Sequence, residues 1–359
     1  MPTLHPALSR AQTFCKGYNL RAPILLAPMA GACPPTLSIA VANAGGLGAC
    51  GALLMQPSAI KAWVSDFRAS SNGGFQLNLW IPDPPPKRDE QIEDAARRFL
   101  AAWGPEVPRG AGTAAPPDFA AQCAAMLDIG PPIISSIMGL YPPAMVDRMK
   151  AQGTKWFATV TTVAEARAAQ DAGADVIVAQ GMEAGGHRGA FDADKAEASM
   201  VGLFSLLPAV VDAVGVPVIA TGGIADARGV AAALVLGASA VQIGTGFLRC
   251  PEAKLPSAWA DAIARTLPEQ TMVTRAFSGR PGRSIATAYV RAAAAPDAPA
   301  PAPYPVQRGL TQSMRDAAIK NNDVERLQAW TGQSARLAPA RAASDVMREL
   351  WEGAQALLS

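Results

Sequence analysis

The chain has 359 residues, of which 50% are hydrophobic and 17% charged, so it can bury a sizeable core. A net charge of +2 and an aromatic content of 6% are too low to favour a nucleic-acid-binding protein or one held on an anionic membrane surface. The five cysteines form no CxxC pair and have no histidine nearby in sequence, which argues against a disulfide framework and against a metal site for zinc.

The N-terminus shows no basic segment followed by an apolar one, so we expect no signal peptide. The longest apolar stretch, residues 203–220, is interrupted by two prolines and Asp212, which is typical of a helix, a turn and a strand rather than a membrane span. We therefore expect a cytoplasmic protein with reduced cysteines. One of the two histidines, His5, lies in an N-terminus that we expect to be frayed.

Apolar runs alternate with alanine-rich segments along most of the chain. The runs are continuously apolar, which is typical of strands buried on both faces. We predict eight strands at residues 24–27, 46–50, 75–80, 133–137, 156–160, 175–179, 217–220 and 240–243. We predict intervening helices at residues 36–44, 57–69, 89–103, 117–127, 142–152, 163–172, 201–214 and 226–236.

This repetition favours an α/β fold, a (β/α)8 TIM barrel with a smaller C-terminal substrate-side region; an open doubly wound sheet is the alternative. We expect the barrel over residues 1–248 and the smaller, irregular region over residues 249–321, covering the barrel mouth. Residues 322–359 are expected to form C-terminal helices that pack on the barrel, with helical segments at 311–331 and 342–357. The sequence does not indicate a role for the proline-rich insertion at 82–117.

Glycine-rich turns follow the seventh and eighth predicted strands, at Thr221-Gly222-Gly223 and Gly244-Thr245-Gly246. In a TIM barrel, phosphate groups often bind at these two strand ends. Glycines there can expose backbone N–H groups to an anion, and the Thr245 hydroxyl can add a donor. The two turns together predict a phosphate site, with ordinary turns as the alternative.

Polar or small residues also end three other predicted strands. Asn78 and Gln180 carry amides, which suit the hydrogen-bonding edge of a flavin or its ribityl chain. Pro28 and Met29 follow the first strand and could form a flat shelf against a planar ring. Loop capping and core packing are the alternatives for these residues.

The stretch at 180–189 carries the second histidine, His187, between glycines that follow the sixth strand. Histidine titrates nearest to neutral pH, so it suits proton transfer or contact with a substrate anion. A tight turn with a surface histidine is the alternative. Glu183, four residues before His187, could orient the imidazole, but we expect it in solvent. Three arginines are candidates for contact with an anionic substrate, although solvent exposure is the simpler expectation for them: Arg188, Arg280 and Arg283.

Several enzyme classes lose support because their sequence patterns are missing. The chain has no Ser-His-Asp arrangement, no paired carboxylates, no Walker A sequence and no GxGxxG fingerprint. Hydrolase, kinase and Rossmann-type functions are therefore disfavoured.

Taken together, these segments resemble the nitronate monooxygenase family, formerly called 2-nitropropane dioxygenases. The resemblance covers residues 22–335, and its most specific part is Glu183-Ala184-Gly185-Gly186-His187. The other matching pieces lie at 27–31, 43–48, 78–80, 220–224, 241–245, 305–307 and 330–333.

The resemblance implies an FMN-dependent barrel enzyme that oxidises alkyl nitronates, or nitroalkanes, with O2 to a carbonyl compound and nitrite. It implies that His187 is the catalytic residue, as a base or as an electrostatic partner of the nitronate. It places the FMN contacts at Pro28, Met29, Asn78, Gln180, Gly185, Gly186, Gly222, Gly223, Gln242, Gly244 and Thr245.

The chain departs from the family pattern at residues 32–36, at Leu26 and in the long insertion. Two other functions stay open. One is an FMN-dependent enoyl-(acyl carrier protein) reductase that uses NAD(P)H, and the other is a non-redox barrel that binds a phosphate ligand. An oligomer is possible.

Overall fold

Eight parallel strands form the central sheet of the computed structural model, which describes residues 5–113 and 115–359. The strand order is β1-β9-β8-β6-β5-β4-β3-β2, and Leu25 of β1 also pairs with Leu47 beside β2, so the sheet closes on itself. This closure confirms the TIM barrel and excludes the open doubly wound sheet. The barrel strands are β1 (Ile24–Leu26), β2 (Gly48–Gly51), β3 (Phe75–Trp80), β4 (Ile133–Ile137), β5 (Lys155–Val160), β6 (Val176–Gln180), β8 (Val218–Thr221) and β9 (Ala240–Ile243).

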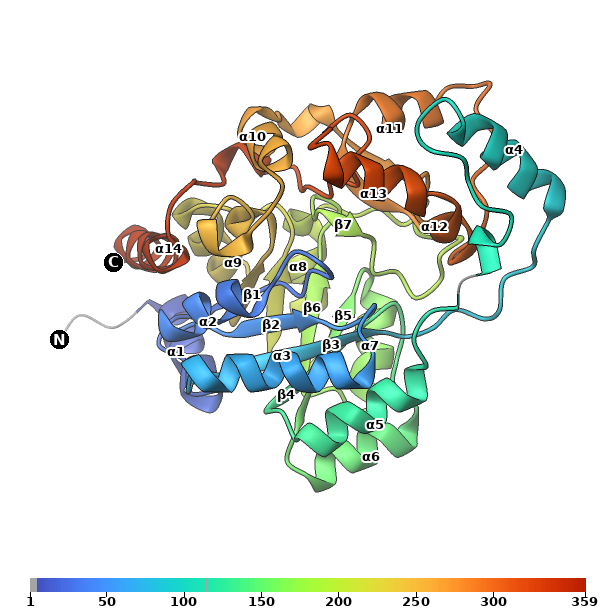
Figure 1. Cartoon of the computed structure of the whole chain (residues 1–359). Helices are drawn as coiled ribbons and strands as arrows, with labels where there is room; N and C mark the ends of the chain where they lie inside the picture. Colours follow the sequence, from blue (N-terminus) through green and yellow to red (C-terminus); the bar gives the residue numbers. More distant parts are fainter. Residues whose placement is uncertain (1–4, 114) are drawn as a thin grey trace.

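Helices surround the barrel, and each expected helix that follows a barrel strand is present (Figure 1). These helices are α2 (Pro35–Asn43), α3 (Pro57–Ser70), α4 (Glu90–Leu100), α5 (Phe119–Ile129), α6 (Pro143–Ala151), α7 (Val163–Asp171), α8 (Leu203–Val211) and α9 (Ala227–Val235). The apolar stretch at 203–220 divides into α8, a turn and β8, as predicted. None of the described helices is long and apolar enough to cross a membrane.

The bottom of the barrel is closed by α1 (Pro6–Gly17), which the sequence did not lead us to expect. Phe14 of α1 packs into a cluster of buried apolar residues inside the barrel, beside Phe157. The expectation of a frayed His5 was wrong, because its Nδ1 accepts a hydrogen bond from the Ala7 N–H at 3.2 Å and so caps α1. Residues 1–4, which belong to the segment where we expected no signal peptide, lie outside the described residues.

A smaller unit covers the barrel mouth and consists of α4, the short 3₁₀ turn η1 (Ala111–Thr113), β7, β10, β11 and α11–α13. Its strands β7 (Gly186–His187), β10 (Thr271–Thr274) and β11 (Gly282–Ile285) form an antiparallel sheet in the order β10-β11-β7. Its later helices are α11 (Ala288–Ala293), α12 (Val306–Leu310) and α13 (Gln312–Lys320), which lie next to α4 in Figure 1. α13 ends at Lys320, so the helix expected to reach residue 331 is shorter than predicted.

The insertion at 82–117 belongs to this smaller unit through its buried side chains. Leu100 of α4 shares one apolar cluster with Phe277 and with Leu310 of α12. The division of the chain at residues 248 and 321 stays a prediction. The apolar cluster shows in addition that α4, far upstream in sequence, packs with residues of the region 249–321.

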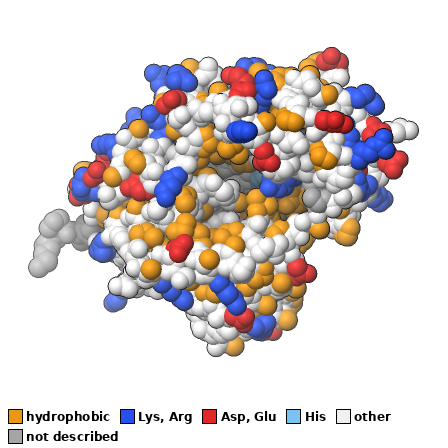
Figure 2. All heavy atoms as spheres, in the orientation of Figure 1, with side chains coloured by type: hydrophobic (Ala, Val, Ile, Leu, Met, Phe, Trp, Pro, Cys, Tyr) orange, Lys and Arg blue, Asp and Glu red, His pale blue; other side chains and the backbone are white. Residues whose placement is uncertain are grey.

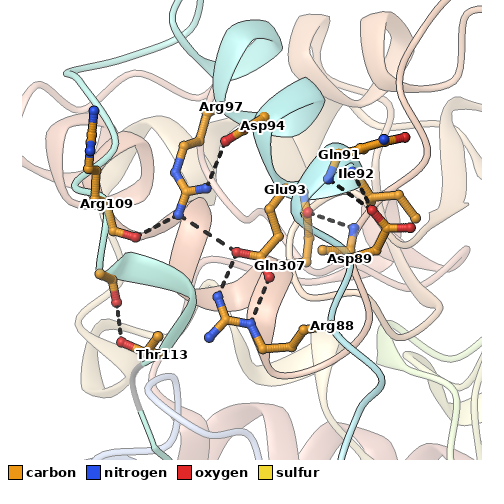
Figure 3. Close-up of polar contacts among 12 residues, drawn as sticks. Arg88, Asp89, Gln91, Ile92, Glu93, Asp94, Arg97, Arg109, Thr113 and Gln307 are labelled. Atoms are coloured by element: carbon orange, nitrogen blue, oxygen red, sulfur yellow. Dashed lines mark hydrogen bonds and ion pairs between the residues drawn. The ribbon is translucent and has the colours of Figure 1, made fainter.

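A buried carboxylate organises α4 within the insertion (Figure 3). Glu93 is 3% exposed and accepts two hydrogen bonds from Arg88, both at 2.7 Å, while Arg97 lies 3.7 Å away. These arginines hold the pKa of Glu93 below its ordinary value, chiefly through the hydrogen bonds from Arg88. The cluster ties the start of α4 to its later turns, so α4 presents a fixed face to α12.

The remaining helices complete the chain around the barrel. They are α10 (Ser257–Arg265), which follows β9, and α14 (Ala343–Leu357), which runs beside α9 (Figure 1). Val346 and Leu350 of α14 belong to the same core cluster as the barrel strands. Short 3₁₀ turns lie at Thr245–Phe247, Pro251–Ala253, Pro268–Gln270 and Ala335–Leu337.

Candidate active site

A cavity of about 800 Å³ opens where the carboxyl ends of the barrel strands face the smaller unit. The face drawn in Figure 2 is hollowed near its centre, with hydrophobic side chains around the opening. A volume of this size falls in the range of small-molecule and cofactor sites. The cavity brings together every residue that the sequence analysis placed in the site: Pro28, Met29, Asn78, Gln180, Gly185, Gly186, His187, Gly222, Gly223, Gln242, Gly244 and Thr245.

The glycine loops after β8 and β9 present backbone N–H groups to this cavity. Gly222 and Gly223 have φ angles of +108° and +71°, a conformation that other residues rarely adopt. The N–H groups of Gly223, Ile224 and Thr245 donate no hydrogen bond to any residue that the structure describes. Unpartnered donors converging on one side of a cavity suit an anion such as a phosphate.

A C-terminal segment, residues 330–334, packs over these glycine loops. The Gly332 N–H donates to Thr245 Oγ1 at 3.0 Å, and the Ser334 hydroxyl donates to the Gly223 carbonyl oxygen at 2.5 Å. Only the family resemblance pointed to part of this segment, residues 330–333. It forms a wall of the cavity and also engages the hydroxyl oxygen of Thr245.

The two amides at the strand ends have different roles: Gln180 stabilises a loop, and Asn78 keeps one atom available to the cavity. Gln180 donates from Nε2 to the His187 carbonyl oxygen at 3.1 Å and accepts from the Gly189 N–H at 2.8 Å, so it holds the loop that carries the histidine. Asn78 donates to Ser135 Oγ at 3.0 Å. Its Oδ1 accepts no hydrogen bond among the described residues and is available to a ligand.

His187 lies in β7, because Gly186 and His187 pair with Arg283 and Gly282 of β11. The imidazole lies edge-on between two indoles, with ring centroids 4.6 Å from Trp80 and 4.8 Å from Trp330. Its position in a small sheet and between two aromatic rings fixes the side chain in the cavity wall. The surface-turn alternative for His187 is therefore excluded.

One nitrogen of the His187 ring is already engaged. Nε2 lies 2.7 Å from Ser278 Oγ, and Nδ1 has no hydrogen-bond partner among the described residues. Burial lowers the pKa of His187 to about 3, with further lowering by Arg280, Arg308 and Arg315. The imidazole is therefore neutral at physiological pH, with one nitrogen free to accept or donate a proton. Ser278 was not found from the sequence, because a lone serine 91 residues away carries no local signal.

The three arginines that we considered as substrate contacts are buried instead of exposed. Arg188 donates to the Gln180 carbonyl oxygen at 2.6 Å, and Arg283 donates to the Met182 carbonyl oxygen at 2.9 Å. Arg280 is bound to Asp83 at 2.7 Å. Each guanidinium is used to join loops around the cavity, so none of the three is free to bind a substrate anion.

The expectation that Glu183 is solvated was wrong as well. Its two carboxylate oxygens accept from the Leu203 N–H at 2.9 and 3.0 Å, at the first residue of α8. A carboxylate at a helix N-terminus is stabilised by the free N–H groups there. Glu183 thus ties the loop before His187 to α8.

Two other arginines, which the sequence analysis did not select, line the cavity. Arg308 and Arg315 form no ion pair within 4 Å among the described residues. Arg315 is buried and bonded to Thr311, Gln312 and Gln328, whereas the half-buried Arg308 guanidinium donates to no described residue. The Asp316 carboxylate lines the same cavity and favours the charged form of Arg308 without forming an ion pair with it. Arg308 therefore gives the cavity an unpaired positive charge that can attract an anion.

Among the described residues, no three His, Cys, Asp or Glu side chains lie close enough together to hold a metal ion. All five cysteines are buried free thiols.

Comparisons with known proteins agree on one family. The family described as nitronate monooxygenase matches residues 13–353 of this chain. A probable nitronate monooxygenase of Staphylococcus aureus (strain Newman) is 35% identical over 339 residues, which is 92% of this chain and 94% of the relative.

Solved structures extend this likeness to three dimensions. A nitroalkane oxidase from Streptomyces ansochromogenes superposes with a TM-score of 0.87 at 34% identity, covering 95% of this chain and 98% of that one. FabK from Thermotoga maritima superposes with a TM-score of 0.75 at 27% identity, covering 96% of both chains.

Proposed function

Because this chain belongs to the nitronate monooxygenase family, and so is an oxidoreductase, we propose that it binds FMN and oxidises alkyl nitronates with O2 to a carbonyl compound and nitrite. The observation that carries the proposal is that His187 and Arg308 line the same cavity as the glycine loops after β8 and β9. A nitronate is an anion, and both the neutral imidazole and the guanidinium can hold it. Neutral nitroalkanes are included in the proposal.

The residues present fit FMN. Added Cβ atoms at Gly223 and Gly244 would lie 3.1 Å from Glu183 Cβ and 3.2 Å from Met29 Sδ, so a larger residue at either position would crowd the side chains that pack beside the cavity. The unpartnered N–H groups supply donors for that phosphate, and the Asn78 amide suits the polar edge of the flavin. When bound, the flavin supplies the redox chemistry.

The protein's own contribution is to bind, orient and deprotonate. Arg308 attracts the nitro or nitronate group, and Trp80 and Trp330 limit its motion beside His187. For a neutral nitroalkane, Nδ1 of His187 accepts the proton from the carbon next to the nitro group, and the negative charge that develops on the nitro group offsets the burial and the arginines that lower the pKa of the imidazole. For a preformed nitronate no proton transfer is needed, and His187 acts by holding the anion.

An enoyl-(acyl carrier protein) reductase that uses NAD(P)H is the second candidate, and the outer wall of the cavity favours it. Leu54 and Ile319 line the cavity and are 43% and 55% exposed, so an acyl chain could lie there. The non-redox barrel is less well supported, because it gives His187 and Arg308 no task.

Four measurements on the purified protein test these functions. We expect flavin absorption, release of FMN on denaturation, and nitrite production when a nitronate is added in air without NAD(P)H. Anaerobic bleaching of the flavin by NADH, without nitrite from a nitronate, would favour the reductase. A colourless protein that takes up no added FMN would contradict both. The cytoplasmic location and a possible oligomer stay predictions.

A further inference from the structure

The proline-rich start of the insertion carries Asp83, whose carboxylate reaches a guanidinium 197 residues further along the chain. Nη1 of Arg280 lies 2.7 Å from Oδ1 and 2.8 Å from Oδ2 of Asp83. The Arg280 side chain is 2% exposed and that of Asp83 24%. The pair is therefore shielded from solvent on the arginine side, where loss of the partner would leave a buried charge uncompensated.

Arg280 holds the two chain segments that flank His187. Its Nη2 donates to the Ala190 carbonyl oxygen at 2.8 Å, three residues after the histidine. Its backbone belongs to a tight turn with Ser278, whose Oγ accepts from the Arg280 N–H at 3.3 Å and lies 3.2 Å from the Arg280 carbonyl oxygen. Asp83 therefore holds the Arg280 guanidinium in place. Arg280 in turn connects the segment at Ala190 with the turn at Ser278.

The same turn determines how Ser278 meets the imidazole. The Ser278 hydroxyl has one hydrogen, and the Arg280 carbonyl oxygen is an acceptor within reach of it. If the hydrogen is donated there, Ser278 Oγ can only accept from His187 Nε2, which lies 2.7 Å away. Nε2 then carries the ring hydrogen and Nδ1 is the basic nitrogen.

We propose that Asp83 is a positioning residue for His187: through Arg280 and the Ser278 turn, it holds the imidazole with Nε2 protonated and Nδ1 basic. The first residues of the insertion are then part of the active site instead of a linker. The value of this arrangement for turnover rests on the function proposed above for His187, but the arrangement itself does not.

Nitrogen-15 NMR of the imidazole tests the proposal directly, because the chain has only two histidines and His5→Gln assigns the second. We expect wild-type His187 to show the Nε2–H tautomer at pH 7, with the protein carrying its bound flavin. Asp83→Asn should give a mixture of tautomers or an exchange-broadened signal. Asp94→Asn is the matched control, because it removes the same charge from the same insertion at an exposed ion pair with Arg97.

Kinetics give the second measurement. Asp83→Asn should lower kcat for a neutral nitroalkane by about 10- to 100-fold with little change in KM, because a small displacement of a catalytic group is enough for such losses. Asp83→Glu should recover part of kcat, and flavin content should stay that of the wild type.

An Nδ1–H tautomer in the wild-type protein would overturn the proposal without any variant, and so would an unchanged His187 signal in a folded Asp83→Asn protein. Should Asp83→Asn fail to fold, Ser278→Ala tests the last contact in the series, since it removes the acceptor for Nε2–H. An unchanged tautomer in that variant would overturn the proposal. If the wild-type protein oxidises no nitronate while the NMR results are as expected, the proposed function fails and the inference on Asp83 stands.

Discussion

The backbone N–H of Gly332 donates a hydrogen bond of 3.0 Å to Oγ1 of Thr245, across 87 residues of sequence. This bond joins the loop after the last barrel strand to the segment that carries Trp330, which in turn lies against His187. The glycine loops proposed for the FMN phosphate and the wall beside the histidine are thus connected by one short segment.

Gly223→Val should weaken FMN binding by at least about tenfold. A tenfold loss of affinity requires only about 1.4 kcal/mol of strain or crowding in the bound state. The new side chain would be strained at φ +71° and would crowd Glu183 at the phosphate side of the cavity. Gly153→Val is the matched control, because Gly153 has φ +76° but no atom within 4 Å of an added Cβ. Flavin titration of both variants measures the difference, and equal affinities would contradict the phosphate site.

His187→Asn should keep FMN and lose about 10²- to 10⁴-fold in turnover of neutral nitroalkanes, the range expected when a general base is removed. Asparagine keeps polarity but cannot accept the proton. Turnover of preformed nitronates should fall much less, because no proton is transferred. Near-wild-type activity on a nitroalkane would exclude His187 as the base.

The protein should lose stability as the pH falls from 6.5 towards 3, in part because of His187. The pKa of His187 is lowered to about 3 in the folded chain by burial and then by Arg280, Arg308 and Arg315, while in an unfolded chain it is about 6.5. Between these values the unfolded state binds more protons, so protonation favours unfolding.

Urea unfolding at pH 7 and pH 5 measures this effect. The loss of stability between the two pH values should be up to about 2 kcal/mol smaller in His187→Asn than in the wild type. His5 is present in both proteins, so any contribution it makes cancels in the comparison. The same loss in both would show that His187 does not resist protonation.

Arg308→Gln should raise KM for an anionic nitronate by about 10- to 100-fold, because a hydrogen bond to a charged group is worth about 1.5–3 kcal/mol. Arg308 has no ion pair among the described residues, so its removal breaks none. Lys320→Gln, at the exposed end of α13, removes the same charge outside the cavity and serves as control. An unchanged KM for Arg308→Gln would show that Arg308 does not bind the nitronate.

Gly309→Ala should destabilise the protein by about 1–3 kcal/mol, the usual cost of overpacking. An added Cβ would lie 2.0 Å from the Ala111 carbonyl oxygen, so α12 and η1 would have to separate. Gly110→Ala, whose Cβ would meet its nearest atom at 3.8 Å, should change the free energy of unfolding by less than about 0.5 kcal/mol. Equal effects of the two substitutions in urea unfolding would show that α12 does not rest on η1.

The barrel could be predicted from the sequence because its signals are local. Apolar runs such as 176–179 need burial on both faces, and their repetition with helices between them leaves few arrangements other than a closed parallel sheet. The same rule places the carboxyl ends of all strands at one mouth, so Asn78, Gln180 and the glycine turns could be assigned to one cavity before any contact was known.

The partners of the charged side chains could not be predicted in this way. Nothing near Arg280 in sequence indicates that Asp83 neutralises it, and nothing near His187 indicates Ser278. The sequence determined the barrel and the residues at its mouth, because hydrophobic periodicity and glycine turns act over a few residues. Only the tertiary structure decided which arginine stays free to meet an anion and which nitrogen of the histidine is engaged, because ion pairs and buried hydrogen bonds join segments that approach each other only in the folded chain.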